Sequence, residues 1–334
     1  MSKYSLDVLL PFHRVDDYLF DAIESSKVAL PPDSRIILIN TSVEDFLIGN
    51  CLSQWDEKVK LVHLPGGNYI QALSFGLKSS EAKYVALMNS DDLVEPSRFL
   101  KQIQSLELNE SKICVTRLQK FVMSAYGKTT NIPSVLGSAP NFFHEAILLL
   151  GSYFADATWC FDAEWAKENN LFSDRNDISD WCTAMRVLKR SSTSVLNERL
   201  YLYRMHSSQF TRSQTFHSNI NFYSSWNQLN CTFGFRALSQ NEIDIVTANP
   251  HARKVDDLEN VLSWLDELEN FLILTFSNSS DRSIKKLFSK RRILVCFRNR
   301  SLLVRIRDVR VIPEVIFEYL RYRKHLRFKL TFSQ

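Results

Sequence analysis

The chain lacks three patterns that would assign it to a narrow class of proteins. Its six cysteines form no CxxC pair and no regular spacing, which argues against a zinc site or a disulfide framework. No stretch approaches the roughly 18 consecutive apolar residues that a transmembrane helix needs. The first residues show no basic segment followed by a long apolar one, so we expect no secretion signal. These absences favour a reduced, cytoplasmic setting and a protein that is not integral to a membrane.

Internal repeats and low-complexity segments are also absent from the sequence. What the 334 residues do have is a hydrophobic content of 45%, which is enough to bury a substantial core. This length favours two domains, or one large domain with an appendage. We place the boundary near residue 220, with a catalytic domain at 1–220 and a helical, basic module at 221–334.

Charge is distributed unevenly along the chain. Residues 281–334 hold 16 Lys and Arg but 4 Asp and Glu, whereas the preceding residues hold 25 and 33. The tail is therefore strongly cationic, and we expect an anionic surface as its partner. A basic cluster begins it, made of Lys285, Lys286, Lys290, Arg291 and Arg292.

After Pro313 the tail sets apolar side chains on one helical face and arginines elsewhere, a pattern typical of a helix on anionic lipid. It predicts a peripheral position on the inner face of the plasma membrane. The alternative is a charged helix packed on its own domain. Nucleic acid is not the expected partner, because no recognised binding motif accompanies the charge.

The first half of the chain alternates strand-like and helix-like segments, which favours a mainly parallel sheet. Ligands of such sheets bind beyond the carboxyl ends of the strands. Residues 131–161 are aromatic and almost uncharged, and we expect them to line a substrate cleft. The expected strands cover residues 5–10, 35–40, 58–64, 84–88, 113–121 and 194–203, and the expected helices residues 16–29, 69–78, 96–106, 161–169 and 177–189.

The region beyond residue 220 carries apolar side chains at helical spacing, which predicts a helix with one packed face. These residues are Leu258, Val261, Leu262, Leu265, Leu268 and Leu272.

One predicted strand, residues 84–88, ends in polar residues and adjacent carboxylates: Asn89, Ser90, Asp91 and Asp92. Oxygen ligands at a sheet edge suit Mg²⁺ or Mn²⁺, which commonly complete their coordination with substrate phosphates. The alternative is a solvated turn that caps the next helix. The ends of the other strands bear on this choice.

Short motifs follow the predicted strands in a definite order, namely Pro11-Phe12-His13-Arg14, Asn40-Thr41-Ser42, Met88-Asn89-Ser90-Asp91-Asp92, Ser179-Asp180-Trp181 with Arg186, and Tyr203-Arg204-Met205-His206. This ordered set resembles the family 2-like glycosyltransferases with the GT-A fold, of the bacterial surface-polysaccharide type. In that family the corresponding positions carry a Pro-x-Tyr-Asn-like turn, Asp-Asp-Gly-Ser, an Asp-x-Asp string, Glu-Asp with a later Arg, and Tyr-Arg-x-His. The resemblance covers about residues 4–212.

The resemblance implies a GT-A fold, which is an α/β, Rossmann-like mixed sheet, here with a C-terminal helical module. It implies an inverting glycosyltransferase that depends on Mn²⁺ or Mg²⁺. The donor would be a nucleotide sugar, UDP-linked, carrying a hexose or an N-acetylhexosamine. The acceptor would be a glycan or a lipid-linked glycan in bacterial surface polysaccharide synthesis. These functional expectations rest on the resemblance alone.

The resemblance also implies roles for particular residues. Asp180 would be the general base that takes the proton from the acceptor hydroxyl. Its alternative role is to cap a helix together with Asp177, which is also the alternative base. His206 would join Asp91 and Asp92 as a metal ligand or contact the diphosphate, whereas a histidine in isolation is more often a packing residue.

The nucleotide of the donor is expected to contact a further set of residues. Their alternative roles are turn formation and core packing. The set comprises Pro11, Phe12, Asn40, Asn89 and Ser90.

Three departures from the family pattern stand at this site. Asn89 replaces the usual first Asp, which removes a negative charge but leaves an amide that hydrogen-bonds. Ser179 replaces the usual Glu, and Leu73 stands where an arginine near the diphosphate is customary. These departures motivate an alternative, a non-catalytic GT-A-like protein that binds nucleotide or serves as a scaffold.

Overall fold

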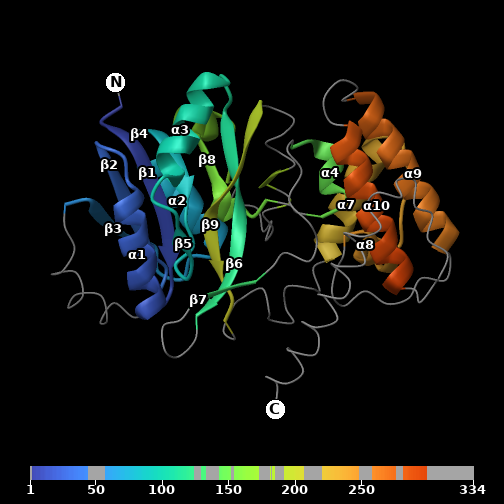
Figure 1. The fold of residues 1–334 in the computed structure, drawn as a ribbon. Coiled ribbons are helices and arrows are strands. Elements are labelled where there is room, and N and C mark those ends of the chain that lie inside the picture. The colour runs from blue at the N-terminus through green and yellow to red at the C-terminus, as the bar shows by residue number, and fades with distance from the viewer. Residues whose placement is uncertain are drawn as a thin grey trace, which may run out of the picture. The chain divides into compact units, whose positions relative to one another are not determined.

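The computed structural model describes residues 2–43, 57–123, 129–132, 143–151, 154–172, 181, 183–184, 192–206, 220–247, 258–275 and 281–298. The chain divides into two compact units (Figure 1), and each is described here by itself. The first unit comprises Met1–Ile132 and Phe154–His217, and the second comprises Pro133–Tyr153 and Ser218–Gln334. The second unit therefore includes a segment from the middle of the chain, which the sequence does not predict.

The first unit begins with the alternation of strands and helices that the sequence predicts. Its elements in chain order are β1 (Tyr4–Phe12), α1 (Asp17–Ala29), β2 (Ser34–Asn40), β3 (Val59–His63), α2 (Tyr69–Ser79), β4 (Ala82–Leu87), β5 (Leu93–Val94), α3 (Arg98–Leu108), β6 (Ile113–Met123), β7 (Thr129–Ile132), the 3₁₀ helix η3 (Asp156–Thr158), β8 (Trp159–Asp162), α5 (Ala163–Glu168) and β9 (Thr193–Arg204).

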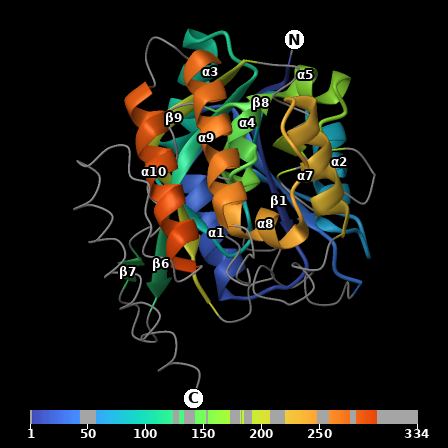
Figure 2. The ribbon, with the colours of Figure 1, turned by 90° about the vertical axis from the view of Figure 1, so that its right-hand side faces the viewer.

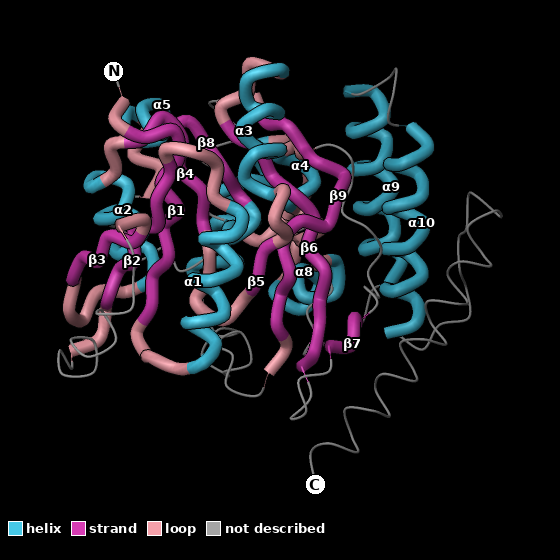
Figure 3. The backbone as a smooth tube through the Cα atoms, turned by 60° about the vertical axis from the view of Figure 1, so that its left-hand side comes forward, coloured by secondary structure: helices cyan, strands magenta, loops and turns pink. Residues whose placement is uncertain are grey.

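Among the described residues, nine strands form one sheet in the order β3-β2-β1-β4-β8-β6-β9-β5, with β7 beside β6 (Figure 3). The pairs among β1, β2, β3 and β4 are parallel, as is β6 with β9. Strand β8 runs antiparallel to both β4 and β6, while β5 and β7 run antiparallel to β9 and β6. The sheet is therefore mixed. The sequence does not predict β5, β7 or β8, since each is too short to show a period.

All seven residues of β2 are buried, and burial on both faces explains the unbroken apolar run from Ile36 to Ile39 at its centre. Leu6, Val8 and Leu10 of β1 share a core cluster with residues of α1 and α3. Helix α2 packs on the opposite face, where a Cβ added to Gly76 would lie 2.5 Å from Cδ1 of Ile39. A glycine at this position lets the helix approach the sheet closely.

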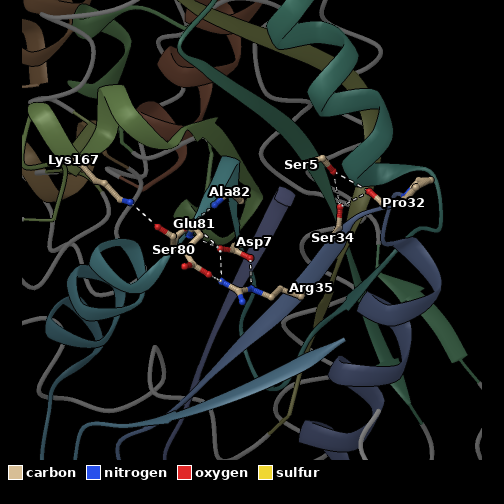
Figure 4. Close-up of polar contacts among 9 residues, drawn as sticks. All are labelled: Ser5, Asp7, Pro32, Ser34, Arg35, Ser80, Glu81, Ala82 and Lys167. Atoms are coloured by element: carbon tan, nitrogen blue, oxygen red, sulfur yellow. Dashed lines mark hydrogen bonds and ion pairs between the residues drawn. The ribbon is translucent and has the colours of Figure 1, made fainter. Parts of the chain in front are cut away.

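The amino ends of the strands are joined by a buried ion pair (Figure 4). Nε of Arg35 donates to Oδ1 of Asp7 at 2.8 Å, and Oγ of Ser80 donates to Oδ2 of Asp7 at 2.7 Å. The backbone N–H of Glu81 donates to Oδ2 as well, at 3.2 Å. Burial lowers the pKa of Arg35, but the hydrogen bond and charge of Asp7 outweigh this effect and raise it. This network ties β1, β2 and the start of β4 together.

The second unit is helical in the part that the structure describes (Figure 2). Trp226 and Trp264 stack at 5.5 Å between ring centroids, and Nε1 of Trp226 donates to the carbonyl of Leu149 at 3.1 Å. The apolar face predicted for residues 258–272 is confirmed, because its residues from Val261 onward are buried. The elements are α4 (Glu145–Leu148), α7 (Ile220–Thr232), α8 (Gln240–Val246), α9 (Leu258–Thr275) and α10 (Asp281–Arg298).

Two arginines of the predicted basic cluster are internal, which corrects their assignment to a lipid-facing surface. Nη2 of Arg291 donates to the carbonyl of Leu150 at 2.8 Å. Arg292 forms ion pairs with Asp266 and with the buried Glu269, both on α9. These two guanidinium groups therefore hold α10 within the second unit. The helix predicted after Pro313 lies outside the described residues, and no described helix has the length and apolarity to cross a bilayer.

Candidate active site

The carboxyl ends of β4 and β9 bring two of the predicted motifs together. Residues 89–92 follow β4, and Arg204 is the last residue of β9. The backbone N–H of Arg204 donates to Oδ1 of Asp92 at 2.8 Å, and its Nε donates to the carbonyl of Asp91 at 2.9 Å. These contacts fix the two acidic residues against the strand that leads to His206.

Asp91 and His206 face each other across this edge. Oδ2 of Asp91 lies 2.9 Å from Nε2 of His206. The Asp91 side chain is 31% exposed, and the His206 side chain is 10% exposed. The imidazole ring also packs against Tyr18 of α1 in a tilted arrangement, with 4.8 Å between ring centroids. A partly exposed carboxylate oxygen and an imidazole nitrogen therefore lie next to each other, and both are atoms that can coordinate a metal ion.

Asp92 has a different environment from its neighbour, because its side chain is fully buried. Its Oδ2 accepts from the hydroxyl of Tyr201 at 2.5 Å and from Nδ2 of Asn89 at 3.1 Å, while Oδ1 accepts from Arg204. Burial and the charge of Asp91 raise the pKa of Asp92 to about 7, although these hydrogen bonds act in the opposite direction. Both oxygens of Asp92 already have partners within the protein.

Asn89 joins the strand end to the start of α2. Its Nδ2 donates to Asp92, and its Oδ1 accepts from the hydroxyl of Tyr69 at 3.2 Å. Tyr69 is the first residue of α2, whose N-terminus is fixed by a capping box between Asn68 and Gln71. The orientation of the amide is thereby set by one donor and one acceptor.

Arg98, at the start of α3, lies beneath the acidic pair and is fully buried. Its Nη2 donates to the carbonyls of Leu87 at 3.1 Å and Ala157 at 2.6 Å. The guanidinium group lies 4.9 Å from the ring centroid of Tyr201. Burial lowers the pKa of Arg98 to about 10, so it stays charged near neutral pH. A buried cation therefore supports the strand end from below.

The residues predicted to contact the nucleotide lie at the same edge of the sheet but are mostly internal. Pro11 and Phe12 end β1 and are buried, and Asn40, at the end of β2, is fully buried. Oδ1 of Asn40 accepts from the backbone N–H of Ser42 at 2.9 Å, and its Nδ2 lies 3.4 Å from Nδ1 of His63. Ser90 is half-buried. Turn and core roles are thus visible for the first three, while nucleotide contact stays a prediction.

The predicted general base Asp180 and its alternative Asp177 lie outside the described residues, as do Ser179 and Arg186. Trp181, which directly follows Asp180, is helical and buried. The catalytic role of Asp180 accordingly stays a prediction.

A divalent cation fits this edge of the sheet. Two donor atoms at right angles on one Mg²⁺ lie about 3.0 Å apart, since each bond is about 2.1 Å long. The 2.9 Å between Oδ2 of Asp91 and Nε2 of His206 is close to this separation, and it is also the length of the hydrogen bond or ion pair that the two side chains form here. No three His, Cys, Asp or Glu side chains of the described residues form a cage for a metal. Ions of this kind are commonly held by one or two side chains together with substrate phosphates, so a cage is not required.

Sequence reasoning missed four residues that shape this site: Tyr18, Asp21, Tyr69 and Tyr201. Their side chains reach the motif residues from α1, α2 and β9, far away in the sequence. A signal was present for Tyr201, which stands two residues before the predicted Tyr-Arg-x-His motif on the same face of its strand. No comparable signal exists for the two residues of α1.

Comparison with known sequences decides the family. The sequence profile of glycosyl transferase family 2 matches residues 7–196, which is more than half of the chain. The chain belongs to glycosyl transferase family 2. The family resemblance drawn from the motifs is thereby confirmed.

Several bacterial proteins share low identity with the chain. It is 23% identical over 110 residues to the uncharacterized glycosyltransferase EpsJ of Bacillus subtilis, covering 32% of each protein. It is 24% identical over 132 residues to the minor teichoic acid biosynthesis protein GgaB of Bacillus subtilis, covering 38% of this chain and 14% of GgaB. An uncharacterized glycosyltransferase of Haemophilus influenzae is 23% identical over 229 residues, covering 68% of this chain and 61% of that protein. The chain thus spans less than two thirds of the length of each.

The fold is similar to crystal structures of TarS from S. aureus. TarS 1–349 in complex with UDP-GlcNAc has a TM-score of 0.53 at 15% identity, covering 96% of this chain and 92% of that chain. The same TarS fragment in complex with UDP has a TM-score of 0.51 at 16% identity, with the same coverage. This likeness confirms the GT-A fold that the motifs implied.

Proposed function

We propose that this family 2 chain transfers a sugar from a UDP-linked donor to a hydroxyl group of a glycan or lipid-linked acceptor in bacterial surface polysaccharide synthesis. The observation that carries the proposal is the pairing of Asp91 with His206 beyond the carboxyl ends of β4 and β9. The structurally similar TarS has been crystallised in complex with UDP and with UDP-GlcNAc. These complexes support a UDP-linked donor whose sugar is an N-acetylhexosamine or a hexose. The relative GgaB, named for minor teichoic acid biosynthesis, supports the acceptor class.

Asp91 and His206 would hold Mn²⁺ or Mg²⁺. When bound, such an ion supplies positive charge that stabilises the departing diphosphate. We assign Asp92 to a supporting role instead of metal ligation, because both of its oxygens accept hydrogen bonds from Tyr201, Asn89 and Arg204. This assignment narrows the three ligands expected from the sequence to two.

The donor nucleotide would lie against the turns at the ends of β1, β2 and β4. Asn89 and Ser90 are the half-buried polar residues here, so they would contact the ribose or phosphates. The buried Pro11, Phe12 and Asn40 would shape the turns that receive the base. Asn40 fixes its turn through Ser42, and Thr41 does the same by donating its hydroxyl to the carbonyl of Phe12 at 3.0 Å.

The transfer would be a single displacement with inversion of configuration. Asp180 takes the proton of the acceptor hydroxyl as that oxygen forms a bond to the anomeric carbon of the sugar. The bond between this carbon and the diphosphate oxygen breaks at the same time, and UDP leaves with the electron pair. Asp177 is the alternative base for this step.

A donor screen tests the proposal. The protein is incubated in Mn²⁺ with UDP-GlcNAc, UDP-glucose and UDP-galactose in turn, and released UDP is measured with and without an acceptor glycan. We expect release with at least one donor. Asp180→Asn is expected to abolish transfer while UDP binding persists. Asp177→Asn tests the alternative base and is expected to retain transfer. Near-normal turnover by Asp180→Asn would reject the base, and UDP binding with no release from any donor would favour the scaffold alternative.

We also propose that the basic tail places the enzyme on anionic lipid, in keeping with a lipid-linked acceptor. Residues 299–334 hold 9 Lys and Arg and 3 Asp and Glu. Truncation after Arg298 leaves α10 intact and is therefore a cleaner test than one that removes this helix. We expect the truncated protein to stop sedimenting with phosphatidylglycerol vesicles while its UDP release continues. Unchanged sedimentation would reject the tail as the anchor.

A further inference from the structure

Helix α1 carries no motif of the family, yet it contacts the candidate metal ligands through Arg204. Arg204 is 1% exposed, so its side chain is buried. Its Nη2 donates to Oδ2 of Asp21 on α1 at 2.8 Å, while its Nε donates to the carbonyl of Asp91. One buried cation thus lies between a carboxylate of α1 and the strand end that bears Asp91.

Aromatic contacts join the same elements. The guanidinium carbon of Arg204 lies 4.7 Å from the ring centroid of Tyr18 and 5.3 Å from that of Phe121. The ring of Tyr18 lies 4.8 Å from that of His206 as well. Tyr18 therefore contacts both Arg204 and His206, which is one of the two proposed metal ligands. This packing fixes the orientation in which the imidazole ring of His206 faces Asp91.

The charge of Asp21 bears directly on metal binding. A guanidinium group removed from water requires an anionic partner. Asp21 supplies one, and its side chain is 45% exposed, so it lies at the surface end of the pair. Without this charge, the buried cation is attracted more strongly to the carboxylates of Asp91 and Asp92. Because a guanidinium group and a divalent cation compete for the same carboxylate, affinity for the metal would fall.

We propose that Asp21 and Tyr18 are positioning residues of the donor site. Asp21 holds the guanidinium group of Arg204 away from the carboxylate of Asp91, and Tyr18 fixes the ring of His206. This inference rests on the proposed function, in which Asp91 and His206 bind the metal. It assigns to α1 a part in the reaction without contact to the substrate.

The test measures Mn²⁺ binding directly, from the electron paramagnetic resonance signal of free Mn²⁺ in the presence of UDP. Partners behind metal ligands typically change metal affinity by about 10-fold or more, and we expect this loss for Asp21→Asn. UDP release at saturating Mn²⁺ should stay near the wild-type rate. Asp21→Glu, which restores the charge, should recover most of the affinity.

The matched control is Glu24→Gln. Glu24 lies on the same helix and is exposed, and it pairs with Lys27 at 3.0 Å, so the substitution removes the same charge without a contact to Arg204. We expect unchanged Mn²⁺ affinity. If Glu24→Gln weakens binding as much as Asp21→Asn, the effect is one of general charge and the proposal is overturned.

Tyr18 is tested by two substitutions. Tyr18→Phe keeps the ring and should bind Mn²⁺ like the wild type. Tyr18→Leu removes the ring, and we expect about 2-fold to 13-fold weaker binding, since an aromatic contact contributes about 0.5–1.5 kcal/mol. Equal affinities for the Phe and Leu variants would overturn the part of the proposal that concerns the ring.

The outcomes separate this inference from the function on which it rests. If the wild-type protein binds no Mn²⁺ with UDP present, the metal-dependent function fails and the inference fails with it. If the wild type binds Mn²⁺ and Asp21→Asn binds it equally well, the function stands and the role of Asp21 is rejected.

Discussion

The two ends of the sheet in the first unit each carry a buried carboxylate, and the difference lies in what stands beside it. At the amino ends, Asp7 accepts from Arg35, Ser80 and the backbone of Glu81. At the carboxyl ends, Asp92 is equally buried and equally supplied with donors. Each end also carries a second, more exposed acid, but the partners differ: Glu81 at the amino ends faces Arg35, whereas Asp91 at the carboxyl ends faces His206.

This comparison shows that burial and a complete set of donors mark a structural carboxylate, even inside an acidic motif. Asp92 resembles Asp7 more closely than it resembles its neighbour Asp91. We therefore propose that the adjacent residues of this motif have different roles: Asp92 holds the strand end through its contacts with β9, and Asp91 takes part in the chemistry. Four predictions test this division, in order of decreasing expected effect.

The largest effect is expected for Asp7→Ala. Removing the buried partner of Arg35 leaves its charge with the exposed Glu81 alone, and breaking a buried ion pair destabilises a protein by about 3–5 kcal/mol. Urea unfolding measures the loss. The control is Glu81→Ala, whose 54% exposed carboxylate lies 3.3 Å from Arg35 and should contribute under about 1 kcal/mol. Equal losses from the two variants would contradict a special role for Asp7.

Asp91→Asn should have the opposite profile, with little change in stability and a large loss of activity. Losing the charge of a metal ligand removes part of the several kcal/mol that an ion supplies to the reaction, so we expect UDP release to fall about 100-fold. Steady-state kinetics over a range of Mn²⁺ concentrations measures this. A turnover within a few-fold of the wild type at saturating Mn²⁺ would exclude Asp91 from the site.

Asn89→Asp sharpens the comparison within the motif. The substitution restores the acid usual in the family but places its carboxylate where an amide now donates to Asp92 at 3.1 Å. We expect a loss of about 1–3 kcal/mol, because a buried acceptor loses its donor. Urea unfolding at pH 7 measures it. Asn89→Ala removes the donor without adding charge, so it should lose less stability than Asn89→Asp. A larger loss for Asn89→Ala would show that charge repulsion is unimportant here.

The smallest effect concerns Asp162, at the end of β8. Burial pushes its pKa upward, but hydrogen bonds from Nζ of Lys112 at 2.7 Å and from the backbone of Trp165 outweigh this and lower the pKa. A lowered pKa stabilises the fold above the unfolded-state pKa, and this contribution disappears as pH falls through the folded-state value.

Asp162→Asn keeps a side chain suited to cap α5 and removes the charge. Since the pair is partly exposed, we expect the wild type to be more stable by under about 1 kcal/mol at pH 7. The difference should shrink as the pH falls below about 3.9, the ordinary pKa of Asp, and vanish only once the pH is below the lower folded-state pKa. A difference that persists at low pH would mean that the charge is not its source.

The strand ends of the first unit could be predicted from the sequence because each apolar run stops at a recognisable turn. The convergence of Asp91 and His206 follows from the order of the motifs, and the structure places the two side chains in contact. The GT-A fold follows from the same order and is confirmed by the likeness to TarS.

Other features could not be predicted because they arise from contacts between distant segments. Asp92 is buried by Tyr201 and Arg204, which follow it by more than a hundred residues. Strand β8 occupies four residues between β4 and β6, too few for a strand period to show. The ion pair of Asp21 with Arg204 depends on where α1 crosses the end of the sheet, which no local pattern reports.

The most direct test of the central claim is the position of Mn²⁺ in a crystal of the protein with UDP, located by anomalous scattering. The account predicts one peak at coordination distance, about 2.1–2.3 Å, from Oδ2 of Asp91 and Nε2 of His206, with Asp92 still bonded to Tyr201. A peak ligated by Asp92, or UDP bound at the edge of the sheet that carries Asp7, would contradict it.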